Sequence, residues 1–131
     1  MNLKAISVIT MFLSFICGFY GVVGLYATIN FGEIFNQQLF FFQALIGIVG
    51  VTAFFLGFIG SILTPKKRWA IYSLTTILSW NILVFVHILI NIEDSLKMIY
   101  LAFHFLMAAV AAFILVHIGY EGKRVYERKC S

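Results

Sequence analysis

Four long apolar runs, separated by short polar stretches, form the pattern along this chain. The runs cover residues 5–29, 38–63, 69–91 and 98–120. A helix needs about 20 apolar residues to cross ~30 Å of hydrocarbon, and each run has that length. The pattern therefore predicts an all-α integral membrane protein in which one domain, residues 1–131, holds four transmembrane helices.

The polar separators, residues 30–37, 64–68 and 92–97, are short enough to join neighbouring helices as hairpins, which predicts an antiparallel four-helix bundle. Pro65, the one proline of the chain, falls in the second separator, where a helix is expected to stop. Because the first run is longer than the apolar part of a signal peptide, we expect it to remain as a helix. Residues 121–131 are expected to form a basic cytoplasmic tail that continues the fourth helix.

The composition agrees with a lipid-facing exterior. Hydrophobic residues make up 63% of the chain and charged residues 11%, whereas a soluble domain carries roughly a quarter charged residues. The net charge of +4 does not indicate nucleic acid, because the basic residues flank apolar runs instead of covering a solvated face. Lipid headgroups are the expected counter-charge.

The basic residues are distributed unevenly over the two sides of the predicted bundle. If the N-terminus is cytoplasmic, eight of the nine Lys and Arg residues lie on that side, and only Lys97 lies outside. Cytoplasmic loops are enriched in Lys and Arg, so we predict that both termini are cytoplasmic. The basic residues expected to contact lipid headgroups are Lys66, Lys67, Arg68, Lys123, Arg124, Arg128 and Lys129. A plasma membrane or bacterial inner membrane is favoured, with an organelle membrane as the alternative.

Each predicted helix carries one stripe of small or polar residues at helical spacing. In lipid, helices associate through close backbone approach and interhelical hydrogen bonds, so we expect these stripes to face inward. The residues expected at the helix contacts are Ser14, Gly18, Gly21, Gly47, Gly50, Gly57 and Gly60. The glycines of the first two helices predict that this pair approaches most closely.

The spacing of Gly50, Gly57 and Gly60, followed by a short polar turn, resembles the second helix of tetraspanins. The run from Gly18 to Gly24 is similar to the small-residue run in their first helix. The large extracellular loop through which that family recognises its partners is absent, since only a short separator joins the third and fourth helices. The resemblance therefore implies no partner and no activity.

The predicted spans hold no Asp, Glu, Lys or Arg, so the three histidines are the remaining candidates for chemistry within the membrane. The absence of Asp and Glu from the spans argues against a carboxylate-driven transporter. His87 and His104 lie on neighbouring helices at depths that differ by only ~3 Å. The pair would suit the two axial positions of one b-type haem, a metal ion or a shared proton. The interpretation that we favour is a pair of neutral histidines that hydrogen-bond to Asn91, a backbone carbonyl or the outer interface.

Two further polar residues within the spans remain ambiguous. Asn81 lies off the main stripe of the third helix. It indicates either a contact with a partner helix or an uncharged amide that the membrane tolerates without a specific role. His117 points about 140° away from His104 on the same helix and is expected to reach the cytoplasmic headgroups. No second haem is expected, because His117 lacks a partner histidine.

The sequence contains no nucleotide-binding loop, Ser/His/Asp set, Cys-x-x-Cys motif or zinc-ligand spacing. We therefore expect a non-enzymatic membrane protein that acts by lateral association, as an accessory or scaffold subunit of a membrane complex or as a homo-oligomer, with no resident cofactor. Two alternatives stay open. One is a single-haem electron-transfer anchor that uses His87 and His104, and the other is a small-solute channel or transporter formed by oligomerisation.

Overall fold

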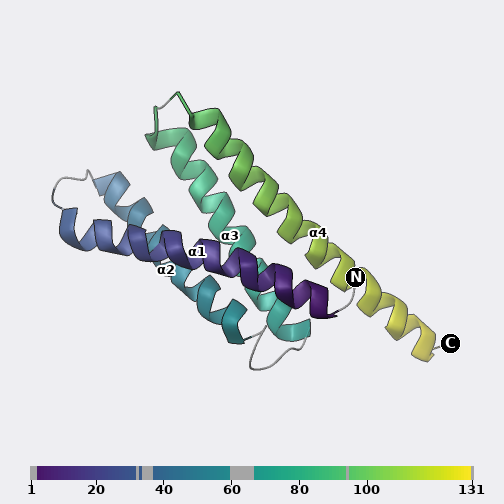
Figure 1. Ribbon diagram of the computed structural model, residues 1–131. Helices are drawn as coiled ribbons and strands as arrows, with labels where there is room; N and C mark the ends of the chain where they lie inside the picture. The colour runs from purple at the N-terminus through teal and green to yellow at the C-terminus, as the bar shows by residue number, and fades with distance from the viewer. Residues whose placement is uncertain (1–2, 32, 34–36, 60–66, 94, 131) are drawn as a thin grey trace.

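The computed structural model describes residues 3–31, 33, 37–59, 67–93 and 95–130, and within these ranges the regular structure is helical (Figure 1). The four long helices are α1 (Leu3–Phe31), α2 (Gln37–Phe58), α3 (Lys67–Asn91) and α4 (Lys97–Cys130). All four are long and apolar enough to cross a membrane. The predicted fold class, an all-α membrane bundle of four helices, is confirmed.

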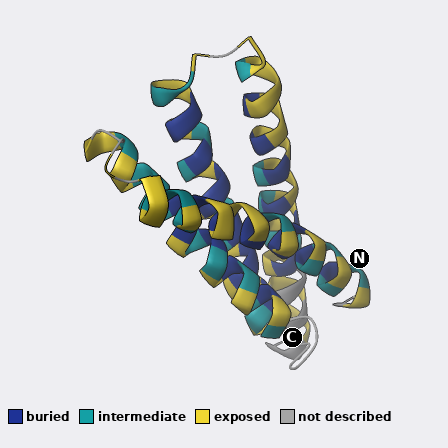
Figure 2. Ribbon diagram, turned by 60° about the vertical axis from the view of Figure 1, so that its left-hand side comes forward, coloured by how far each residue is buried: buried dark blue, intermediate teal, exposed yellow. Residues whose placement is uncertain are grey.

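Helix α3 occupies the centre of the bundle. It packs against α1, α2 and α4, whereas α4 packs mainly against α3. Its side chains are correspondingly buried: Leu74, Ile77, Trp80 and Asn81 have no exposed surface. The α1–α2 hairpin and the α3–α4 hairpin diverge toward their connecting loops, as Figures 1 and 2 show from two directions. The bundle is therefore a pair of hairpins joined through α3.

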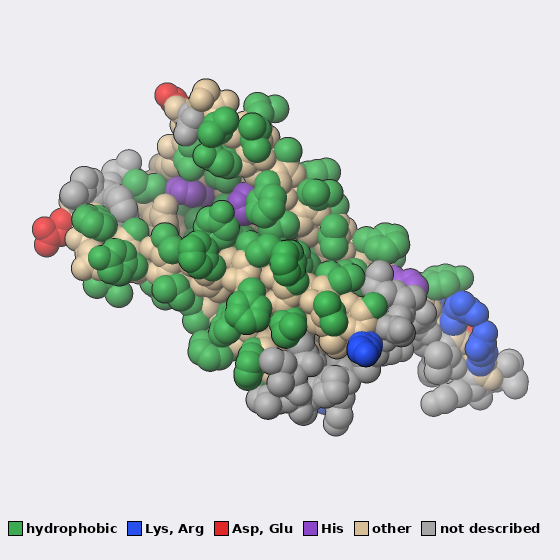
Figure 3. Space-filling view, in the orientation of Figure 1, with side chains coloured by type: hydrophobic (Ala, Val, Ile, Leu, Met, Phe, Trp, Pro, Cys, Tyr) green, Lys and Arg blue, Asp and Glu red, His purple; other side chains and the backbone are tan. Residues whose placement is uncertain are grey.

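Charged side chains gather at opposite ends of the bundle (Figure 3). We call the end that carries both chain termini the basic end; its described, exposed basic residues are Lys4, Arg68, Lys123, Arg124 and Arg128. The opposite end, which carries the α1–α2 and α3–α4 connections with Glu33 and Glu93, is called the acidic end. Here Lys97 Nζ donates a hydrogen bond to the carbonyl of Leu89 (3.0 Å), which ties the start of α4 to the end of α3.

Helices α1 and α2 touch backbone to backbone. A Cβ atom added at Gly21 would lie 2.9 Å from the backbone nitrogen of Val51, and one at Gly47 would lie 3.1 Å from the carbonyl oxygen of Gly21. At Gly18 an added Cβ would come within 2.7 Å of Phe54 Cβ. Such contacts are the main source of attraction between helices in lipid, where apolar burial gives none.

A second crossing joins α1, α2 and α3 nearer the basic end. Ser14 Oγ donates to the carbonyl of Thr10 at 2.7 Å and accepts a hydrogen bond from Ser73 Oγ at 3.4 Å. A Cβ atom at Gly57 would overlap the Ser14 side chain, so glycine is what lets the three helices meet here. Gly60 lies outside the described residues.

Candidate functional site

A cavity of about 440 Å³ lies between the helices toward the acidic end, and we call it the polar cavity. All four helices contribute to its wall. Its polar and aromatic lining residues are Tyr20, Gln43, Trp80, His87, Tyr100 and His104. None of the described lining residues is Asp, Glu, Lys or Arg. Figure 3 shows histidine side chains in a hollow near this end of the molecule.

His87 is held by two amides. Its Nδ1 lies 3.1 Å from Asn91 Nδ2, one turn further along α3, and its Nε2 lies 3.4 Å from the side-chain amide of Gln43 on α2. In both contacts the nearer amide atom is the nitrogen, Nδ2 of Asn91 and Nε2 of Gln43, which can only donate. A neutral imidazole accepts at one nitrogen and donates at the other, so when Asn91 donates, the Gln43 amide must turn to present its oxygen to Nε2–H. Both ring nitrogens of His87 are therefore in contact with an amide.

His104 is held in one tautomer by a chain of hydrogen bonds. Asn81 Nδ2 donates to the carbonyl of Ile77 at 2.9 Å, which directs Asn81 Oδ1 away from that carbonyl. His104 Nδ1 lies 2.9 Å from this oxygen and must donate to it. The proton of the neutral ring is thus on Nδ1, and Nε2 keeps the lone pair.

Aromatic rings surround His104 on its cavity side. The Trp80 ring lies 5.5 Å from the His104 ring, and the Tyr20 ring lies 6.0 Å from Trp80 and 6.5 Å from His104. Trp80 is fixed because its Nε1 donates to the backbone carbonyl of Ile46 at 3.0 Å. An indole can come this close to the α2 backbone because the neighbouring residue is Gly50, where an added Cβ would lie 2.9 Å from Trp80 Nε1.

The two histidines singled out from the sequence line the same cavity, and Asn91 contacts His87. Asn81 and Gln43 are the partners that the sequence did not assign. Asn81 is fully buried although it lies off the main polar stripe, because α3 packs on three helices and buries more than one face. The signal available in the sequence was the polar residue itself, since an amide within an apolar span usually hydrogen-bonds to another helix.

The proposed axial ligation of haem requires a free nitrogen on each histidine. His104 Nε2 meets this requirement, whereas His87 would have to give up its contact with Asn91 or Gln43. The described residues contain no group of three or more His, Cys, Asp or Glu side chains placed to hold a metal ion. Haem binding and metal binding stay predictions.

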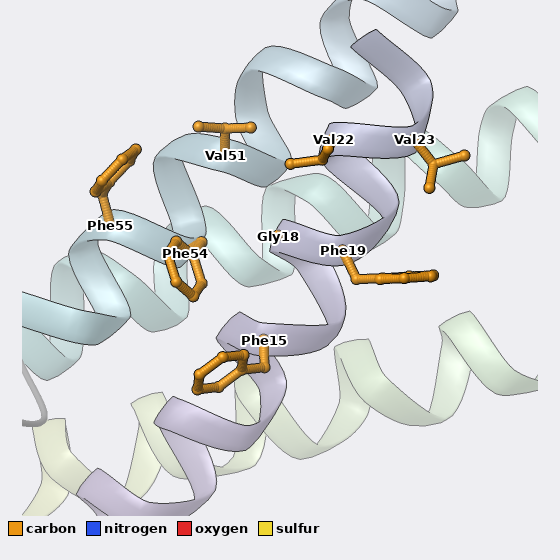
Figure 4. A pocket seen from close by; sticks show the side chains of 8 residues that line it. All are labelled: Phe15, Gly18, Phe19, Val22, Val23, Val51, Phe54 and Phe55. Atoms are coloured by element: carbon orange, nitrogen blue, oxygen red, sulfur yellow. The ribbon is translucent and has the colours of Figure 1, made fainter. Parts of the chain in front are cut away.

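A second hollow, of about 460 Å³, lies in the groove between α1 and α2 (Figure 4). Gly18 lies at its centre, and the rings of Phe15 and Phe54 meet edge to face across it, 5.3 Å apart. Apart from Gly18, the described lining residues are Phe and Val, so the groove offers no polar side chain to select a ligand. Chemical selectivity is concentrated in the polar cavity.

The predicted headgroup residues that the structure describes, Arg68, Lys123, Arg124 and Arg128, are exposed at the basic end. Lys66 and the side chains of Lys67 and Lys129 lie outside the described residues. His117, which the sequence placed apart from the other histidines, is half-buried on α4 and does not line the polar cavity.

The fold and the cavity define a class: a multi-pass membrane protein with four helices and an uncharged polar site between them. Neither the family models nor the curated proteins and solved structures that were compared with this chain match it.

Proposed function

We propose that this protein acts by lateral association in the membrane, as an accessory or scaffold subunit of a membrane complex or as a homo-oligomer. The observation that carries the proposal is the position of α4, which packs mainly on α3 and directs the opposite side of the helix outward. We call that side the open face of α4; it consists of Ala102, Phe105, Leu106, Ala109, Phe113 and Val116, all exposed.

Two properties of the open face suit a helix–helix contact. Ala102 and Ala109 are two helical turns apart, so both small side chains lie along one line on which another helix could approach closely. Phe105 and Phe113 flank this line and would pack against the approaching helix. The connections between α1 and α2 and between α3 and α4 are short, so the lipid-facing surface is the largest surface available for recognition.

We expect Ala109→Trp to abolish association while leaving the fold unchanged, because the indole would hold a second helix away from the open face. The measurement is cysteine cross-linking between copies that carry Ala102→Cys, together with a list of proteins that co-purify after mild extraction. Ile48→Trp is the control, since Ile48 is 56% exposed on α2, away from α4. Protein that is strictly monomeric and co-purifies with no other protein would contradict the proposal.

We further propose that the basic end lies in the cytoplasm of a cell whose plasma or inner membrane holds the protein. The gathering of Lys and Arg at one end of the bundle, with Lys97 as the basic residue at the other end, supports this orientation. Each basic residue close to an anionic surface would contribute about 1 kcal/mol to the attraction.

The orientation predicts a difference in labelling between the two ends. In a chain freed of Cys17 and Cys130 by Cys→Ala substitution, Glu93→Cys should react with a membrane-impermeant maleimide on intact cells. Arg124→Cys should react only after permeabilisation. The reverse pattern would show that the basic end faces outward.

A single-haem electron-transfer anchor is the second candidate, because His87 and His104 line one cavity. If haem binds there, protein expressed with ample haem will show a Soret band that disappears in His104→Ala and in His87→Ala. His117→Ala is the matched control and should retain the band. A colourless preparation would exclude this candidate.

A further inference from the structure

The polar cavity contains an acceptor whose direction is fixed by the protein. The carbonyl of Ile77 orients Asn81, and Asn81 in turn holds the proton of His104 on Nδ1. The remaining ring nitrogen, Nε2, can therefore only accept a hydrogen bond. His104 is 7% exposed and lines the polar cavity. A group that satisfies Nε2 must bring an O–H or N–H donor.

The surroundings exclude a charged ligand. His87 is four residues from the end of α3 and His104 is seven residues from the start of α4, which places both within the membrane-spanning segments. A charge at that depth has a large desolvation cost unless an opposite charge compensates it. Since none of the described lining residues carries a fixed charge, the ligand must be neutral.

The size and walls of the cavity favour a ring. Its volume of about 440 Å³ falls within the range of small-molecule sites. Tyr20 and Trp80 supply aromatic surface next to His104, while Val84 and Ile88 supply aliphatic surface. Gln43 offers a second polar contact, because its single contact with His87 leaves further donor and acceptor capacity on the amide.

We infer that the polar cavity binds a neutral, lipid-soluble ring compound whose hydroxyl group donates a hydrogen bond to His104 Nε2. The apolar remainder of the ligand lies against the Val and Ile side chains. Phenol-type rings, as in quinols, and sterols share this chemistry. The inference rests on the cavity alone and does not depend on association through α4.

The test uses pairs of ligands in which a methyl group replaces the hydroxyl hydrogen. Para-decylphenol is compared with its methyl ether, and cholesterol with its methyl ether, in purified protein that carries Trp69→Phe. Trp80 is then the single tryptophan, and its fluorescence reports on the cavity that it lines. Each ether also partitions more strongly into detergent than its parent, so affinities are compared per mole fraction of ligand in the micelle. Loss of the discrimination in the His104 variant then assigns the difference to the hydrogen bond.

We expect one parent compound to bind at least about tenfold more tightly than its ether, which is the effect of one buried hydrogen bond. Discrimination by the phenol pair identifies a quinol-like ligand, and discrimination by the cholesterol pair identifies a sterol.

His104→Phe should remove the discrimination, and His117→Phe should retain it. If His104→Phe does not fold, the comparison of each compound with its ether on protein that retains His104 still tests the inference. Equal affinity within both pairs, or no change in Trp80 fluorescence with any of the four compounds, would overturn the inference.

Discussion

Gly50→Leu will prevent the bundle from assembling, and Gly50→Ala will lower its free energy of unfolding by about 1–3 kcal/mol. A Cβ atom at this position would lie 2.6 Å from the carbonyl oxygen of Cys17, 2.9 Å from Trp80 Nε1 and 3.0 Å from Gly21 Cα. Two of these atoms belong to the backbone of α1 and the third to a fully buried indole on α3, so no flexible side chain can move aside. Relief requires α1 and α3 to separate from α2.

Cys17 provides the measurement for this prediction. It is a free cysteine with no exposed surface, so it should react with a thiol-specific dye only when α1 leaves the bundle. In a Cys130→Ser background, we expect the temperature of half-maximal labelling to fall in Gly50→Ala, and labelling without heating in Gly50→Leu. Gly119→Ala is the matched control, because an added Cβ there meets nothing within 4 Å. Equal labelling temperatures for the Gly50 and Gly119 variants would refute the packing argument.

Asn81→Leu will destabilise the bundle by about 1–3 kcal/mol, the cost of leaving a buried hydrogen-bonding group without its partner. Leucine has the branched shape and the number of side-chain heavy atoms of asparagine but cannot accept the hydrogen bond from His104 Nδ1, which is 2.9 Å from Asn81 Oδ1. His104 would then be buried against an apolar side chain with its N–H unsatisfied. The loss should appear as a lower temperature of Cys17 labelling.

A double-mutant cycle separates this hydrogen bond from simple packing. When both partners are replaced by apolar groups, as in Asn81→Leu with His104→Phe, no unsatisfied donor remains. We therefore expect the double variant to recover part of the stability that Asn81→Leu loses. If the two single losses simply add, Asn81 and His104 are not coupled, and the tautomer argument for His104 fails.

The sequence predicts the helices well because apolar length and charge placement are local properties. It predicts the close approach of α1 and α2 for the same reason, since glycines at helical spacing show where a neighbouring helix can contact the backbone. It does not predict that α3 is central. We expected one inward stripe per helix, whereas α3 packs on three neighbours and buries Asn81 on a second face.

Asn91 was expected as a partner of a histidine and contacts His87, whereas Gln43 and Asn81 escaped prediction for a related reason. Similar depths bring His87 and His104 to the same cavity, but the rotation of each helix decides which nitrogen meets which amide. Gln43 reaches His87 from α2, a contact between residues 44 positions apart. Such a pairing depends on how far the α1–α2 and α3–α4 hairpins diverge. The polar pattern of a single helix carries no information about that divergence.

Helix α4 is also longer than its membrane crossing requires. Its 34 residues extend about 51 Å at 1.5 Å per residue, against ~30 Å of hydrocarbon. The last turns of α4 therefore extend beyond the hydrocarbon at the basic end. They are continuous with the helical segment that carries His104. The tip lies ~39 Å along the axis from that histidine, so a tilt of only ~5° at the cavity would sweep it sideways by ~3 Å. Small adjustments deep between the helices would thus be magnified at the membrane surface.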